Sequence, residues 1–140
     1  MKKLILMIVC MLGVYGQSNA QGNNKIVVKV DKINSSEGTV NVALFNSEKD
    51  FLNKPYMSKI KDANGGELEF EFEAVPNGEY TISIYHDVNK NGELDKNFIG
   101  IPNEPYGVSL EGRSMFGPPN YSDAKFTLAN ENTKLVISLD

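Results

Sequence analysis

The chain has 140 residues, with 18 acidic side chains against 14 basic ones and a single cysteine. This length is enough for one domain with its own hydrophobic core. The acidic balance and the lack of a basic cluster argue against nucleic acids and anionic membrane surfaces as partners.

The first twenty residues have the order of a secretory signal peptide. Lys2 and Lys3 supply a positive start, an apolar run follows at residues 4–14, and Ser18 and Ala20 place small side chains before a cleavage site. The apolar run of about 11 residues is well short of the ~20 that span a bilayer. The pattern therefore predicts removal of residues 1–20, a periplasmic or secreted protein, and no transmembrane segment in the mature chain.

Cleavage after Ala20 changes the composition in two ways. It removes the only cysteine, Cys10, so the mature domain has neither a disulfide nor a thiol for catalysis. It also removes two of the 14 basic residues and none of the 18 acidic ones, which leaves 12 against 18 and a formal net charge of −6. Residues 21–25 are polar and predict a short linker before a domain at 26–140.

Alternating apolar and polar residues predict six strands along this domain. The clearest case is 67–73, where Leu68, Phe70 and Phe72 share one face and four glutamates share the other, as on a half-buried strand with a solvated outer face. A seventh strand is expected near 106–110, and one or two helical turns near 47–53. The six strands are predicted at 26–30, 40–44, 67–73, 80–84, 124–128 and 135–139.

Turn residues separate these strands. Pro76, Asn77 and Gly78 favour a tight turn, because proline presets φ and Asn-Gly accepts a positive φ. Asn130-Glu131-Asn132 is expected to close a hairpin between the last two strands. Short strands at this spacing, without alternating helices, predict an all-β fold: a single antiparallel β-sandwich of about seven strands, the architecture of immunoglobulin-like domains. The predicted core consists of Val28, Val42, Leu68, Phe70, Phe72, Ile82, Ile84, Phe126 and Ile137.

Two stretches show no strand pattern, residues 46–66 and residues 98–122. The second is rich in proline and glycine. Long irregular connections in compact domains are often functional, which makes the 98–122 loop a candidate binding region. The alternative is a loop that only covers an edge of the sandwich, and the sequence leaves both open.

The segment that leaves the strand at 80–84 has the spacing of a calcium loop. Asp87, Asn89 and Asn91 place oxygen atoms at positions 1, 3 and 5, Gly92 permits the sharp reversal at position 6, and Asp95 stands at position 9. Ca²⁺ takes 6–8 oxygen ligands, and alternate residues of a tight loop can turn their oxygens inward. The alternative is that Asn91-Gly92 is only a hairpin turn.

The loop departs from the EF-hand pattern at position 12, where Phe98 replaces the bidentate glutamate. Another carboxylate must complete the coordination, and we expect a weakly bound ion. The predicted ligands of one Ca²⁺ are Asp87, Asn89, Asn91, Glu93 through its carbonyl, Asp95 and, from outside the loop motif, Glu104.

Sequence patterns of enzymes are scarce. His86 is the only histidine, and it shares a strand face with Ile82 and Ile84, so a packing role is expected and a zinc site is not. Ser83, His86 and Asp87 are close in sequence, but neighbouring strand residues point to opposite faces, and no nucleophile-elbow pattern exists. A carboxylate-dependent hydrolase that acts through the 98–122 loop region remains the alternative function.

Four motifs together resemble the DUF2141 family of exported bacterial domains. They are PNGEY at 76–80, HDVNKNGELD at 86–95, GIPNEPYG at 100–107 and GPP at 117–119. The resemblance implies a small prealbumin-like β-sandwich, supports Glu104 as a site residue, and implies no enzymatic activity. We therefore expect an exported, non-catalytic module, stabilised by calcium, that binds an unidentified component of the cell envelope or the extracellular space.

Overall fold

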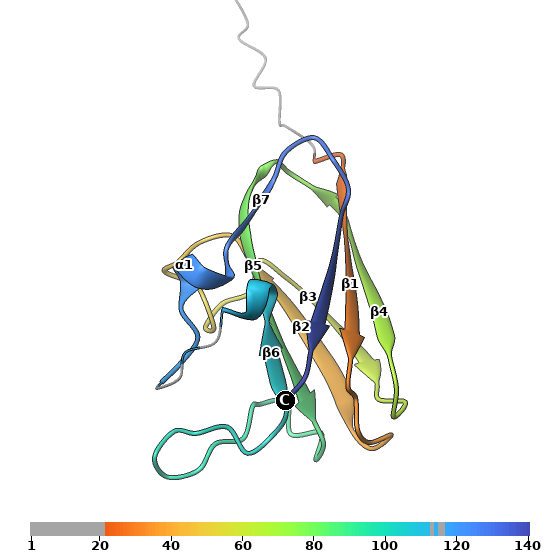
Figure 1. Cartoon of the computed structure of the whole chain (residues 1–140), viewed down its shortest axis with the longest axis vertical. Coiled ribbons are helices and arrows are strands. Elements are labelled where there is room, and N and C mark those ends of the chain that lie inside the picture. Colours follow the sequence, from red (N-terminus) through yellow and green to blue (C-terminus); the bar gives the residue numbers. More distant parts are fainter. Residues whose placement is uncertain (1–21, 113, 115–116) are drawn as a thin grey trace, which may run out of the picture.

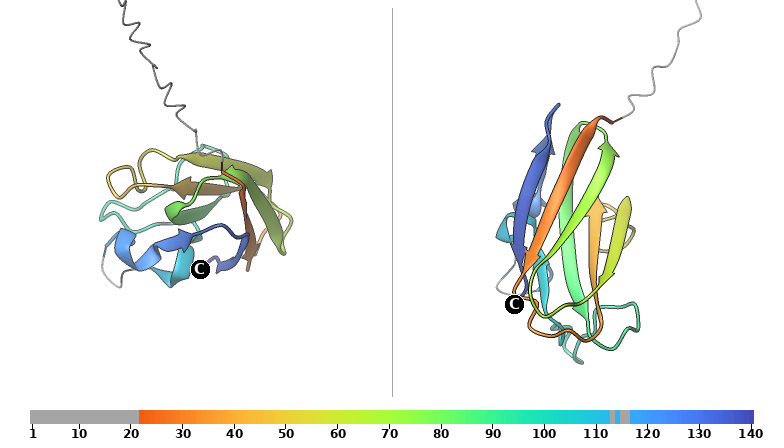
Figure 2. Two further views of the ribbon diagram at one scale, coloured as in Figure 1. Left: turned by 90° about the horizontal axis from the view of Figure 1, so that it is seen from above. Right: turned by 90° about the vertical axis from the view of Figure 1, so that its right-hand side faces the viewer.

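The computed structural model describes residues 22–112, 114 and 117–140, and the predicted signal peptide at 1–20 lies outside them. Within these residues eight strands form two sheets that face each other (Figure 1, Figure 2), which confirms an all-β sandwich. The strands are β1 (Asn24–Asp31), β2 (Thr39–Phe45), β3 (Met57–Asp62), β4 (Leu68–Val75), β5 (Gly78–Asp87), β6 (Tyr106–Val108), β7 (Phe126–Leu128) and β8 (Thr133–Ser138). The short helical segments are η1 (Ser109–Glu111) and α1 (Tyr121–Ala124).

One sheet has the order β4-β1-β8, and the other has the order β3-β2-β5-β6 with β7 also paired to β5. All pairs are antiparallel except β1 and β8, which run parallel with Val30 opposite Ile137. The prediction of a wholly antiparallel sandwich was therefore wrong at this pair. The predicted hairpin at 130–132 was also wrong, because β7 pairs with β5 in one sheet and β8 pairs with β1 in the other. Alternation shows which face of a strand is buried, but not which neighbour it takes.

The strand that the sequence did not reveal is β3, in the middle of the stretch 46–66. It is an edge strand that pairs only with β2 among the described strands, and almost all of its residues are exposed. Its sequence, MSKIKD, lacks the inward apolar row that marks a half-buried strand. Lysines on an exposed edge are a common protection against pairing with other chains.

Three smaller expectations also differ from the structure. Residues 48–53 form hydrogen-bonded turns, with the Phe51 amide donating to the Glu48 carbonyl at 3.2 Å, in place of a helix. β1 begins at Asn24, and therefore takes in two residues of the predicted linker 21–25. Ala124 ends α1 and does not start a strand.

The seventh strand expected near 106–110 is confirmed as β6, which is followed by η1 from Ser109.

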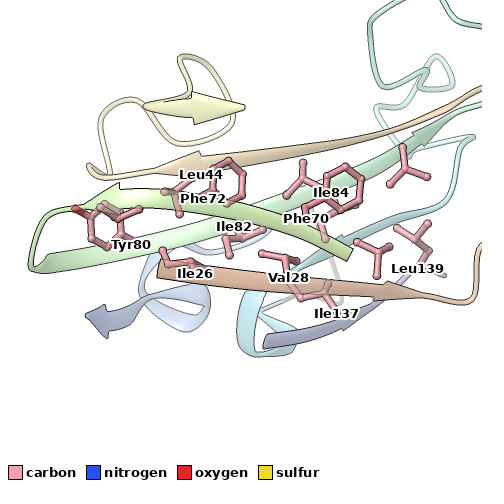
Figure 3. Close-up of a cluster of buried hydrophobic side chains, with 14 of the residues drawn as sticks. Ile26, Val28, Leu44, Phe70, Phe72, Tyr80, Ile82, Ile84, Ile137 and Leu139 are labelled. Atoms are coloured by element: carbon pink, nitrogen blue, oxygen red, sulfur yellow. The ribbon is translucent and has the colours of Figure 1, made fainter. Parts of the chain in front are cut away.

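The core lies between the two sheets, and side chains from both sheets meet there (Figure 3). Seven of the nine predicted core residues are at most 4% exposed, while Leu68 and Phe126 are half-buried and pack against the cluster. The predicted facing of the alternating strands is therefore confirmed. The seven are Val28, Val42, Phe70, Phe72, Ile82, Ile84 and Ile137.

The glutamate row of β4 faces outward, as its alternation predicts. Lysines of the other two strands of this sheet reach it: Lys25 and Lys29 from the adjacent β1 lie 2.8 Å from Glu71 and Glu67, and Lys134 from β8, on the far side of β1, lies 3.1 Å from Glu69. The hydrogen bond from Lys25 lowers the pKa of Glu71. Exposed ion pairs of this kind contribute little to stability, so the row is a solvated face rather than a cation site.

Candidate metal centre

The candidate loop connects β5 to β6 and projects beyond the strands at one end of the sandwich (Figure 1). β5 and β6 are antiparallel neighbours, with Tyr85 opposite Tyr106. At the base of the loop, the amide of His86 donates to the carbonyl of Pro105 at 2.9 Å. This pairing brings the two arms of the loop together, so residues near 87–95 can meet residues near 104.

Asp87 is the last residue of β5, and its carboxylate is turned into the loop. It is 2% exposed, and its Oδ1 and Oδ2 accept hydrogen bonds from the backbone amides of Asn91 at 3.1 Å and Gly92 at 2.8 Å. Gly92 has a φ of 82°, which favours glycine and permits the reversal. The position that the sequence assigned as the first ligand therefore organises the whole turn.

Three further predicted ligands, Asn89, Asn91 and Asp95, are joined to one another by hydrogen bonds. The side-chain oxygens of Asn89 and Asn91 accept from the amides of Asn91 and Glu93 at 3.1 and 3.0 Å. Their side-chain nitrogens both donate to the carboxylate of Asp95, at 2.6 and 2.8 Å. An ion held between these groups would take the place of the two amide donors, with the amide oxygens turned toward it.

Glu104 joins the two arms of the loop. It is 8% exposed, and its Oε1 and Oε2 accept from the amides of Val88 at 2.9 Å and Asp95 at 3.1 Å. The amide of Asn103 also donates to the carbonyl of Asp95 at 2.7 Å. Both carboxylate oxygens of Glu104 thus support the backbone of the loop.

The loop concentrates negative charge. The side chain of Glu93 is exposed, and the hydroxyl of Tyr85 donates to the carbonyl of Gly92 at 2.9 Å. Burial, and then the negative charges of Asp87, Glu104 and Glu93, raise the pKa of Tyr85. In the part of the chain that the structure describes, no three histidine, cysteine, aspartate or glutamate side chains are grouped to hold a metal. Any cation site in the loop therefore depends on the amide oxygens of Asn89 and Asn91 as well as on carboxylates.

His86 has the packing role that the sequence predicts. It is 1% exposed, and its Nε2 lies 2.7 Å from the carbonyl oxygen of Glu37. A carbonyl only accepts, so Nε2 carries the proton and donates. The side chain links the end of β5 to the turn before β2.

The predicted loop 98–122 divides into two parts with different surroundings. Its later part covers the sandwich edge: Ser109 is fully buried, its hydroxyl accepts from the amide of Ile82 and donates to the carbonyl of Ala124, and Tyr121 packs edge-on against Phe51. Its first part is exposed, and Phe98, Ile99 and Ile101 are 99%, 64% and 54% accessible. Sequence reasoning overlooked these three. The available signal was an apolar run without alternation inside a proline- and glycine-rich segment.

Two surface hollows lie away from the candidate loop. One, of about 340 Å³, lies between β8 and the segment 108–111, and includes Leu110 and Val136. The other, of about 540 Å³, is lined mainly by asparagines, including Asn77 and Asn130. Asn77 lies in the turn between β4 and β5, at the opposite end of the sandwich from the candidate loop (Figure 1). Neither is lined by any residue of 87–104.

The fold and the loop together define a small all-β sandwich domain with an acidic, asparagine-rich loop at one end. The family model described as "Uncharacterized protein conserved in bacteria (DUF2141)" matches residues 28–136. The chain belongs to this family, as its four motifs implied. No curated protein and no solved structure gives a significant match. Over the described residues, no helix has the length and apolar character needed to cross a membrane.

Proposed function

We propose that this protein is an exported, non-catalytic β-sandwich module whose 87–104 loop binds one Ca²⁺ and which attaches to a component of the cell envelope or its surroundings. The observation that carries the proposal is the convergence of Asp87, Asn89, Asn91 and Asp95, with Glu104 arriving from the other arm of the loop. A hairpin turn requires only the Asn-Gly pair and does not require these other oxygen-bearing side chains.

The donor set suits calcium better than other common ions. All predicted ligands are oxygens, which hard cations prefer, and the mature chain has no cysteine and one buried histidine, a poor set for zinc. Phe98 stands where an EF-hand has its bidentate glutamate, and its side chain is 99% exposed. The affinity should therefore be weak, with a Kd of about 10⁻⁴–10⁻³ M, which is typical of extracellular calcium modules.

Calcium is expected to raise the thermal stability of the mature protein. At about 1 mM Ca²⁺ and a Kd of about 0.1 mM, linkage adds about 1.4 kcal/mol to the free energy of unfolding. This corresponds to a rise of a few degrees in Tm. Mg²⁺ should have a smaller effect, because it loses its water reluctantly and prefers a tighter octahedron. Melts in chelator, Ca²⁺ and Mg²⁺, together with calorimetric titration, measure the effect.

Two variants test the ligands. Asp87→Ala should abolish the calcium-dependent rise in Tm, while Glu104→Ala should reduce it. Both should also lower the Tm in chelator, because each removes the acceptor of two backbone amides. The informative quantity is therefore the difference between the two melts of each variant. An unchanged wild-type Tm and no heat of binding would leave the loop as a hydrogen-bonded turn without a metal.

Export is expected to remove residues 1–20. The basis is the basic, apolar and small-residue order of this segment. Intact-mass measurement of protein recovered from periplasm or medium should give a chain that begins at Gln21. A recovered chain that still begins at Met1 would contradict this part of the proposal.

No contact or hollow among the described residues favours the alternative of a carboxylate-dependent hydrolase. Such an enzyme needs a concave site with converging carboxylates. The carboxylates of Asp87 and Glu104 instead accept hydrogen bonds from backbone amides of the loop. We therefore propose binding, and not hydrolysis, as the function of this module.

A further inference from the structure

The outer end of the candidate loop is an apolar tip. We define the tip as residues 96–103, which continue the chain beyond Asp95 and return it to Glu104. Its large apolar side chains, Phe98, Ile99 and Ile101, are among the most exposed hydrophobic groups of the described residues. Such a cluster, on a protruding loop, is the kind of surface that marks an interaction site.

The backbone of the tip is hydrogen-bonded within itself through Asn97. Its Oδ1 accepts from the amides of Ile99 and Ile101, both at 3.0 Å. Its own amide donates to the carbonyl of Ile101 at 2.8 Å, and its carbonyl accepts from the amide of Gly100 at 3.0 Å. A β-bridge between Lys96 and Pro102 closes the base of the tip. The tip therefore presents apolar side chains while several of its backbone polar groups are already paired.

This pairing favours a lipid over a protein as the occupant. A bilayer interior offers no hydrogen-bonding groups, so inserted backbone must be satisfied internally, and each unpaired group costs several kcal/mol. The tip meets this requirement at the amides of Asn97, Ile99, Gly100 and Ile101.

The charge of the tip fits a phospholipid headgroup. Lys96 is its only charged residue and is exposed, whereas the carboxylates of Asp87, Asp95 and Glu104 stand at the base of the loop. A lysine next to apolar groups can extend toward phosphates while those groups enter the acyl boundary. The carboxylates at the base of the loop and the net negative charge of the whole chain oppose contact with anionic lipid. A bound Ca²⁺ would offset that repulsion.

We propose that the tip is a membrane-docking element that inserts Phe98, Ile99 and Ile101 into the interfacial region of a phospholipid bilayer. Insertion itself depends on the apolar side chains and on Asn97. A second part, that Ca²⁺ strengthens docking on anionic lipid, rests on the proposed calcium loop. A phospholipid surface is then the envelope component that the module binds.

Co-sedimentation of the mature protein with vesicles tests insertion. On phosphatidylcholine vesicles the wild type should pellet, and the variant with Phe98→Ser, Ile99→Ser and Ile101→Ser should partition at least ~100-fold less, since each apolar side chain contributes on the order of 1 kcal/mol or more. The matched control replaces Ile60 and Val136 by serine, because they are 63% and 60% exposed on β3 and β8, away from the loop. This control should pellet like the wild type.

The outcomes separate the two parts of the proposal. Equal pelleting of the tip variant and the wild type would overturn insertion. Pelleting of the wild type without vesicles would also overturn it, in favour of self-association.

Vesicles of equal parts phosphatidylcholine and phosphatidylglycerol, with chelator or millimolar Ca²⁺, test whether calcium strengthens docking on anionic lipid. A calcium-dependent gain that Asp87→Ala removes supports it. Calorimetric calcium binding without any pelleting overturns membrane docking and leaves the proposed calcium module intact. Pelleting that calcium does not increase overturns only the calcium dependence.

Discussion

Replacing Phe70 by alanine is expected to lower the free energy of unfolding by roughly 3–5 kcal/mol. The ring of Phe70 is fully buried on β4 and faces side chains of the opposite sheet, among them Ile84 (Figure 3). Its removal would expose no polar group but would leave a cavity that the two sheets cannot fully close. The ring also lies under the Lys61 ammonium, 5.2 Å from its centroid, and this contact would be lost as well.

The neighbouring residue provides the control. Glu71 follows Phe70 on the same strand, points outward, and forms an ion pair with Lys25 at 2.8 Å. Glu71→Ala should leave the urea midpoint close to that of the wild type, because exposed ion pairs contribute little. Urea unfolding of both variants, followed by circular dichroism, measures the difference. Similar losses at the two positions would mean that the facing of β4 is wrong.

Gly38→Ala is expected to be the next most damaging substitution, with a loss of about 3 kcal/mol or more. Gly38 has a φ of 77°, and a methyl group there would lie 2.1 Å from the carbonyl oxygen of Asp87 and 2.5 Å from the Cα of Val88. Both neighbours are backbone atoms and cannot move aside as a flexible side chain can. The strand end that carries Asp87 must shift, so the calcium-dependent rise in Tm should also fall.

Gly65→Ala separates the strain of a positive φ from the steric clash of the added methyl group. Gly65 has a similar φ of 70°, but the nearest atom to an added methyl group is 3.6 Å away. This variant should lose only the left-handed backbone penalty, about 1–2 kcal/mol, and keep its calcium response. Urea unfolding and paired melts with chelator or Ca²⁺ compare the two variants. Equal losses would show that the close approach of Gly38 to β5 does not contribute.

The sequence by itself determined the features that follow from local geometry. Successive side chains of a strand point to opposite faces, so the alternation at 67–73 was enough to bury Phe70 and Phe72 and to expose the glutamates. The convergence of Asp87 and Asn91 is equally local, because short polar side chains bond to backbone amides a few residues away.

Only the tertiary structure decided the features that depend on distant partners. β8 lies parallel to β1, and β3 forms an exposed edge. Which strands become neighbours depends on pairing between distant segments, and the alternation within one strand does not indicate its neighbour. Glu104 reaches Val88 because β6 returns along β5, which no spacing within the motif could predict. Phe98 lies in the connection between β5 and β6, which projects beyond the strands at one end of the sandwich (Figure 1). It is 99% exposed, although its residue type alone would favour the core.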